Sequence, residues 1–106
     1  MRPPEELETL KLICPNVKEM SEGDTTFYFL PDLKISGQGN FDALLCPQGR
    51  DGYPTRLFLS KKISGKGDNW KIHRIFDREW HTWSWKDVGV TLSLTEILSA
   101  HLDALR

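Results

Sequence analysis

The chain has few side chains that could form a nucleophile or a metal centre. Its 106 residues include two cysteines, Cys14 and Cys46, and three histidines, His73, His81 and His101. A structural zinc site needs three or four converging ligands. The histidines are too far apart in the sequence for a helical i, i+4 pair, and neither cysteine joins them at ligand spacing or belongs to a C-x-x-C pair. We therefore expect no metal and no cofactor, and we interpret both cysteines as buried free thiols.

Other catalytic patterns are equally weak. The segment Gly65-Lys66-Gly67 is a turn fragment and lacks the rest of a phosphate-binding G-x-x-x-x-G-K-[ST] loop. Asp77 and Glu79 are near each other only in an extended segment, and nothing marks them as a general acid and base. Histidine is the residue type suited to acid–base catalysis near neutral pH, so His73 and His81 are the first candidates for catalysis, and Cys46 is the candidate thiol.

Three tryptophans, Trp80, Trp83 and Trp85, fall within six residues. They bring large apolar area and indole N–H groups that need hydrogen-bond partners. One interpretation is a loop whose tryptophans cover the sheet and anchor the last helix. The other is a surface that binds a partner, because tryptophan is enriched where interfaces gain most of their energy. Both interpretations hold if different tryptophans serve different roles.

Charge is distributed unevenly along a chain whose net charge is −1. Residues 1–30 contain three basic and six acidic side chains, whereas residues 56–78 contain seven basic and two acidic ones. Basic residues beside tryptophans are typical of proteins that stack single-stranded bases. The overall charge and the lack of an RNA-binding motif make a nucleic-acid-binding module an alternative only. No apolar run approaches the ~20 residues of a membrane span, and no signal-peptide core is visible, so we expect a cytoplasmic protein that does not bind membranes.

The elements that must position these residues follow from periodicity and turn signals. Helices are predicted over residues 4–13 and 94–105, the second from a Ser93–Glu96 capping box and an apolar stripe. Strands are predicted over residues 17–20, 25–30, 33–35, 41–46, 55–60 and 70–76, with Pro31 ending the second strand and the tryptophan segment 80–87 forming a loop. Alternation assigns the side chains to two faces: Tyr28 and Leu30 opposite Phe27 and Phe29, Phe41, Ala43 and Leu45 opposite Asp42, Leu44 and Cys46, and Leu57 with Leu59 on one face. The whole chain, residues 1–106, is predicted to be one α+β domain. Its predicted core is an antiparallel β-meander of about four strands flanked by the two helices.

Several short motifs resemble the ubiquitin-conjugating-enzyme-like (UBC-like) family, most closely its divergent prokaryotic members. They are Leu30-Pro31, the strand Phe41–Cys46 followed by Pro47, Gly52-Tyr53-Pro54, and Trp80-His81-Thr82-Trp83-Ser84 ahead of the last helix. The resemblance implies a UBC-like fold over about residues 4–105. It also implies partners from a ubiquitin-like tagging pathway: a ubiquitin-like protein or the enzymes that activate or deconjugate it.

The chain departs from this family at the catalytic position. Active members carry a His-Pro-Asn motif and a cysteine before the Trp-Ser segment, but residues 71–77 contain neither. Without a thiolate at that position no thioester forms there. The resemblance therefore implies an adaptor that binds partners through Tyr53, Pro54, Trp80, Trp83 and Trp85. An active conjugating enzyme that uses Cys46, a nucleic-acid-binding module and an unrelated α+β domain are the alternatives, and the residues do not fix the oligomeric state.

Overall fold

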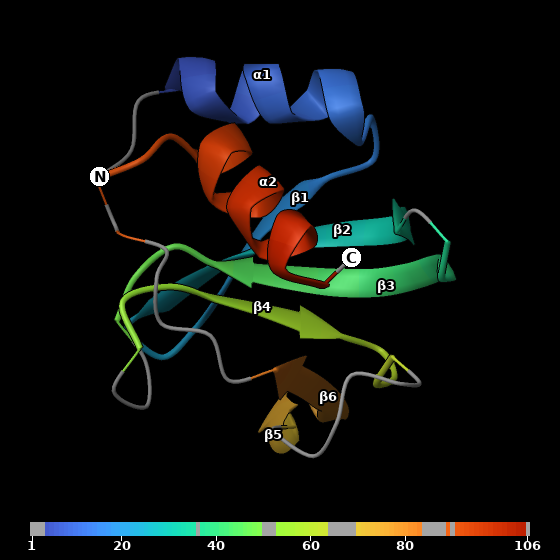
Figure 1. Ribbon diagram of the computed structural model, residues 1–106. Helices are drawn as coiled ribbons and strands as arrows, with labels where there is room; N and C mark the ends of the chain where they lie inside the picture. Colours follow the sequence, from blue (N-terminus) through green and yellow to red (C-terminus); the bar gives the residue numbers. More distant parts are fainter. Residues whose placement is uncertain are drawn as a thin grey trace.

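The computed structural model describes residues 4–35, 37–49, 53–63, 70–83, 89 and 91–105. Its elements are α1 (Pro4–Ile13), β1 (Lys18–Glu22), β2 (Thr25–Ile35), β3 (Gly39–Cys46), β4 (Arg56–Leu59), β5 (Trp70–Ile75), β6 (Arg78–Trp83) and α2 (Leu94–Leu105). Within these residues the protein is α+β, with two helices and one antiparallel sheet of six strands (Figure 1). The predicted α+β class is confirmed, but the sheet is larger than the predicted four or so strands.

Both helices occupy the predicted residues and lie on the same face of the sheet (Figure 1). The capping box forms as expected: the Glu96 amide donates to Ser93 Oγ at 3.3 Å, and the Ser93 amide donates to Glu96 Oε1 at 3.1 Å. The hydrogen bond from the Ser93 amide, with the Ser93 hydroxyl adding to it, lowers the pKa of the Glu96 carboxyl. The Leu94 amide, one of the free donors of the first turn, donates to Glu6 Oε1 of α1 at 2.8 Å. The two helices are thus joined where α2 begins.

The strand order is β1-β2-β3-β4-β6-β5, so the first four strands form a meander and the last two are reversed. The predicted loop at residues 80–83 is wrong, because this segment is part of β6 and pairs with both β4 and β5. Trp80 and Thr82 are buried on one face, while His81 and Trp83 lie on the other. This two-residue alternation is that of a strand.

A first core fills the space between the helices and the sheet. Alternate residues of the strands supply it, as the sequence predicts for β2, β3 and β4. The buried members on this helix-covered face include Tyr28, Leu30, Phe41, Ala43, Leu45, Leu57 and Leu59, with Leu94, Ile97, Leu98 and Leu105 from α2. The apolar stripe of α2 is therefore held against β2–β4.

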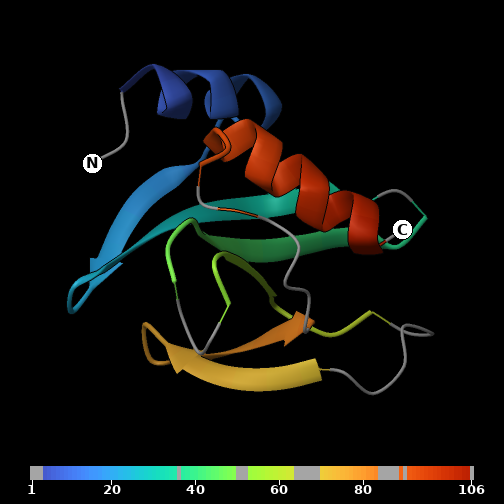
Figure 2. The ribbon, with the colours of Figure 1, turned by 60° about the vertical axis from the view of Figure 1, so that its left-hand side comes forward.

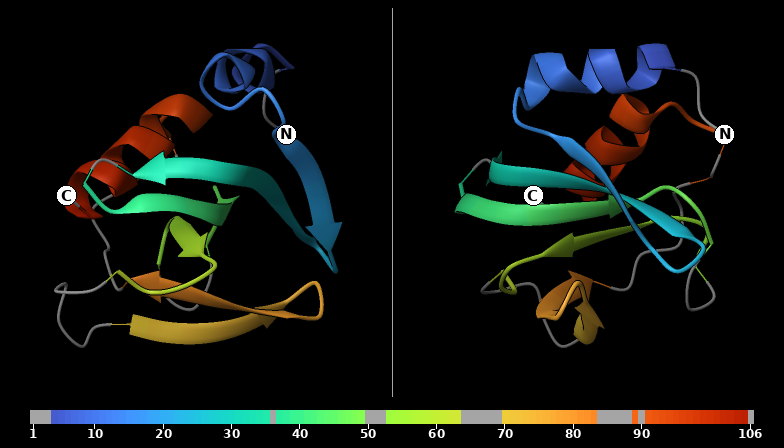
Figure 3. Two further views of the ribbon diagram at one scale, coloured as in Figure 1. Left: turned by 90° about the vertical axis from the view of Figure 1, so that its right-hand side faces the viewer. Right: turned by 180° about the vertical axis from the view of Figure 1, so that it is seen from behind.

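A second, smaller core occupies the face of the sheet that carries no helix. Its buried members are Phe27, Leu44, Cys46, Phe58, Ile75 and Trp80. The sheet curves so that the β5–β6 turn approaches the β1–β2 turn (Figure 3, left). At this closure the Phe76 amide donates to Glu22 Oε2 at 2.6 Å, and the Phe76 ring meets the Phe27 ring edge-on at 5.6 Å between centroids. Because the sheet curves, strands rather than helices cover the second core.

A β-bulge replaces the strand end predicted at Pro31. The pairing of β2 with β3 shifts register between Leu30 and Leu33, and β2 continues to Ile35. Asp32 takes a positive φ of 57°, and its amide donates to Asp42 Oδ1 at 3.1 Å. A bulge tolerates proline because the inserted residues leave the ladder. The predicted end of the strand at Pro31 is therefore wrong: Pro31 lies in a bulge within β2.

The β5–β6 hairpin turns through two residues in the left-handed region, Phe76 with φ 54° and Asp77 with φ 59°. Two positive φ values are typical of a type I′ turn, in which glycine is the favoured second residue. An L-residue with a side chain pays about 1 kcal/mol in this region. Phe76 is compensated by its contacts with Phe27 and Glu22, whereas Asp77 is exposed.

We expect Asp77→Gly to raise the free energy of unfolding by about 0.5–1 kcal/mol, because it removes the left-handed strain from the turn. Urea unfolding followed by circular dichroism measures this change. Phe76→Gly is the matched comparison. It relieves the same strain but loses the packing on Phe27, so a net destabilisation is expected. A stabilisation by both variants would contradict the role of Phe76 in closing the sheet.

Candidate functional site

The tryptophans that were predicted to bind a partner do not form one surface among the described residues. Trp80 is 2% exposed in the second core, and its indole N–H donates to the Ile75 carbonyl at 3.1 Å. The Arg78 guanidinium lies 4.5 Å above the Trp80 ring, and Arg78 also pairs with Asp42 at 3.2 Å. Trp80 is thus a packing residue, with its polar atom satisfied internally. Trp85 lies outside the described residues.

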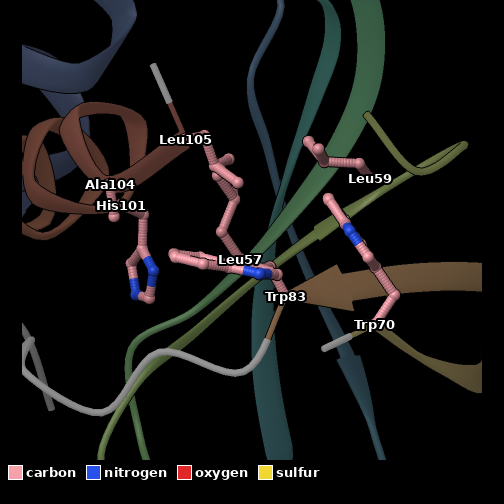
Figure 4. Close-up of a pocket in the computed structure, with 7 residues that line it drawn as sticks. All are labelled: Leu57, Leu59, Trp70, Trp83, His101, Ala104 and Leu105. Atoms are coloured by element: carbon pink, nitrogen blue, oxygen red, sulfur yellow. The ribbon is translucent and has the colours of Figure 1, made fainter. Parts of the chain in front are cut away.

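Trp83 lies on the opposite face, half-buried beside α2. Together with Trp70 of β5 it lines a small cavity whose other walls are Leu57, Leu59, His101, Ala104 and Leu105 (Figure 4). The Trp83 indole extends toward His101, while the Trp70 indole lies beside Leu59 (Figure 4). The cavity volume is about 10 Å³, which is space for roughly one water molecule. It is a packing gap between helix and sheet and is too small to hold a substrate.

Tyr53 and Pro54 lead into β4 and are half-buried. The Tyr53 ring lies 4.0 Å from the Arg56 guanidinium carbon, a cation–π contact. Arg56 is only 1% exposed, and its Nε donates to Thr82 Oγ1 of β6 at 3.3 Å. Tyr53 therefore covers a buried arginine, so the Tyr-Pro segment shapes the loop by packing on a charge.

A buried polar contact missed by the sequence analysis lies between β4 and α2. Thr55 Oγ1 and His101 Nε2 are 2.9 Å apart, and both residues are buried. Burial, together with the positive charge of Arg56, lowers the pKa of His101 from 6.5 to about 4. His101 is thus neutral at pH 7. The sequence signal was a histidine on the apolar stripe of a helix, and its partner threonine could not be found without the register of β4.

His73 and His81 are not brought together. Ile72 pairs with His81 and His73 pairs with Trp80 across the hairpin, which places the two histidines on opposite faces. The His73 ring lies 5.2 Å from the Phe58 ring, toward the second core. His81 lies on the helix-covered face and is half-buried. The two histidines therefore cannot act as one acid–base pair.

The two thiols are both buried. Cys46 is 0% exposed in the second core, and its Sγ donates to the Gln48 carbonyl at 3.5 Å. Cys14 is 5% exposed after α1, and its Sγ donates to the Pro31 carbonyl at 3.7 Å. Burial, with the Asp32 charge adding to it, raises the pKa of the Cys14 thiol. Reactive thiols are exposed and have lowered pKa values, so neither has the surroundings of a nucleophile.

Two surface features are open to a partner. A hollow of about 550 Å³ between α1 and the β1–β2 hairpin is lined by Lys11, residues 15–18, Phe29 and Pro31. The other is strand β5, whose Ile72 is 58% exposed. Ile72 is the one large apolar side chain with such exposure among the described strands. Strand β5 pairs directly with β6, the strand that carries Trp80 and Trp83.

The described residues contain no group of three or more His, Cys, Asp or Glu side chains that could hold a metal ion. Neither described helix has the length and apolar character that a bilayer crossing requires. Comparison of the chain with models of protein families, with curated proteins and with solved structures gives no match. The fold and its surfaces are therefore what support a function.

Proposed function

We propose that the chain is a UBC-like domain of a prokaryotic ubiquitin-like tagging pathway that binds partners and carries no thioester. Its partners in this proposal are the ubiquitin-like protein or the enzymes that activate or deconjugate it. The order of elements supports the proposal: a helix, a four-stranded meander with the Tyr53-Pro54 pair ahead of its fourth strand, a segment with Trp83, and a final helix. The motifs that resemble the family occur in the same order.

The observation that carries the proposal is the burial of both cysteines. Transfer of a ubiquitin-like tag through a thioester needs a thiolate that the activating enzyme can reach. Cys46 is 0% exposed and Cys14 is 5% exposed, and the sequence contains no other cysteine. Burial in apolar surroundings favours the neutral thiol. This favours a binding role over conjugation through Cys46.

The segment that replaces the catalytic region also supports a binding role. Residues 71–77, where active relatives of the family carry their cysteine, here belong to β5 and the turn after it. A strand paired along its length offers a rigid surface with exposed main-chain groups. Such a surface suits recognition of another chain better than acyl transfer.

We expect no covalent adduct when the chain is incubated with ATP and with the activating enzyme and ubiquitin-like protein of the same organism. Non-reducing gels detect an adduct, and calorimetry of the same proteins without ATP measures non-covalent binding. Binding without an adduct is the expected result. A thiol assay supports it: the folded chain should react slowly with 5,5′-dithiobis(2-nitrobenzoate), and both thiols should react after unfolding.

Three outcomes would contradict the proposal. A reducible adduct that disappears in Cys46→Ser would show an active conjugating enzyme. Binding of single-stranded oligonucleotides that weakens steeply with salt, with no binding of the tagging proteins, would show a nucleic-acid-binding module. Absence of both kinds of binding would leave an α+β domain outside this pathway.

A further inference from the structure

In the part of the chain that the structure describes, strand β5 forms one outer edge of the sheet. The strand order ends with β5, which pairs with β6 along one side, from Trp70 opposite Trp83 to Ile75 opposite Arg78 (Figure 2). The outer strand of a sheet presents main-chain donors and acceptors to its surroundings and is a template for another extended chain. β5 spans six residues, which is long enough for strand addition.

The side chains of β5 favour an acidic, extended partner. Lys71 and Arg74 are exposed, and the strand has no acidic residue of its own. Because side chains alternate along a strand, Arg74 lies on the helix-covered face with Ile72, and Lys71 lies on the other face. Glu79 lies opposite Arg74 on β6 and offsets part of its charge on that side. A chain added at the outer side would meet one basic residue on each face and the exposed Ile72 between them.

The same residues disfavour a second copy of the chain as the occupant. If two β5 strands paired antiparallel with full overlap, Lys71 of each copy would lie opposite Arg74 of the other. Like charges directly opposite each other destabilise a strand pair. Lysines and arginines on an outer strand are a common protection against such self-association. An acidic segment reverses the sign of these interactions.

We infer that β5 binds an extended acidic segment of a partner protein as an added strand, with an apolar side chain against Ile72 and a carboxylate near each of Lys71 and Arg74. This inference deepens the proposed partner-binding role and rests on it for the identity of the partner. Main-chain hydrogen bonds would supply the affinity, and the charges would select the segment.

The probe is the peptide acetyl-Thr-Glu-Val-Thr-Glu-Thr-amide, in which the two glutamates fall on opposite faces of a strand with valine between them. Added parallel to β5, this peptide places its glutamates beside Lys71 and Arg74 and its valine beside Ile72. We expect titration of this peptide to shift the amide resonances of residues 70–75 in ¹⁵N spectra and to leave those of β1 unchanged. Replacing both glutamates with lysine should abolish the shifts. Arg74→Glu should weaken binding by about fivefold or more, because an attraction becomes a repulsion. The matched control, Lys18→Glu on β1 at the opposite edge, should bind as the unaltered chain does.

Three results would overturn the inference. Equal binding by the same peptide with N-methylated amides would show that main-chain pairing is not used. Displacement of the peptide by a single-stranded oligonucleotide would assign the basic edge to nucleic acid. Self-association that grows with protein concentration, and that becomes stronger in Arg74→Glu because each Lys71 would then face a glutamate of the other copy, would show that a second copy covers the edge.

The inference and the proposed function fail in different ways. If the tagging proteins bind but Arg74→Glu and the peptide have no effect on that binding, the inference is wrong and the proposed function stands. If the peptide binds at β5 but no tagging protein binds, the strand site stands and the pathway is wrong.

Discussion

Replacing Trp80 with alanine is expected to lower the free energy of unfolding by about 3–5 kcal/mol, the usual cost of removing a buried tryptophan from a core. The indole is 2% exposed, meets the Phe29 ring edge-on at 6.3 Å, and donates to the Ile75 carbonyl. Its removal leaves a cavity under the curved sheet and takes one hydrogen bond from the Ile75 carbonyl. Urea unfolding followed by far-ultraviolet circular dichroism measures the loss. Domains of this size have about 5–15 kcal/mol in total, so partial unfolding at 25 °C is within reach.

Trp83→Ala is the matched control from the same strand. Trp83 is half-buried beside the small cavity, so part of its ring is already in water and its replacement should cost only about 1–2 kcal/mol. If Trp80→Ala and Trp83→Ala lowered the free energy of unfolding by the same amount, the assignment of Trp80 to the core would be contradicted. A stable Trp80→Ala variant that loses partner binding would return Trp80 to the candidate interface.

The second large effect is a loss of stability on mild acidification, caused by His101. Its pKa is lowered from 6.5 to about 4 in the folded protein, so the unfolded chain binds a proton more readily than the folded one. The contribution that neutral His101 makes to the free energy of unfolding is therefore complete above pH 6.5, decreases as pH falls, and is lost below pH 4. The whole change corresponds to about 3 kcal/mol, of which about 2 kcal/mol is lost by pH 5. Unfolding free energies measured between pH 7 and pH 5 test this before most carboxylates titrate.

His101→Gln should abolish most of this pH dependence, because glutamine can still hydrogen-bond to Thr55 but does not titrate. His81→Gln, a change at a half-buried histidine outside this contact, should retain it. Arg56 is the charged neighbour that adds to the effect of burial. An unchanged slope in His101→Gln would mean that another group causes the acid sensitivity.

The sequence predicted those parts of the fold whose signals are local. The capping box at Ser93 and the stripe of α2 fix a helix without help from the rest of the chain. The alternation in β2, β3 and β4 assigned the correct residues to each face. Pairing partners are not local, so the position of β6 between β4 and β5 could not be predicted. A proline and a cluster of tryptophans then misled the assignment at Pro31 and Trp80.

The candidate site residues were predicted from their residue types rather than from their positions in the fold. This is why the structure places them apart from one another. Tryptophans signal both cores and interfaces, and only burial separates Trp80 from Trp83. His73 and His81 are close in sequence, but an eight-residue separation across a tight turn places them on opposite faces. The exposed Ile72 gave no signal, because an isoleucine between basic residues reads as an ordinary strand residue. The family resemblance stays a prediction.

The reversed order of the last two strands has a consequence for synthesis on the ribosome. β4 is completely buried in the finished protein, yet its neighbour on the outer side is β6, which follows β5 in the chain. Once β4 has left the ribosome, its outer side therefore stays uncovered until both β5 and β6 have been synthesised. During this interval Leu57, Phe58 and Leu59 form an uncovered apolar edge of the kind that chaperones bind. The outer strand, β5, is thus made before β6, the strand that pairs with β4.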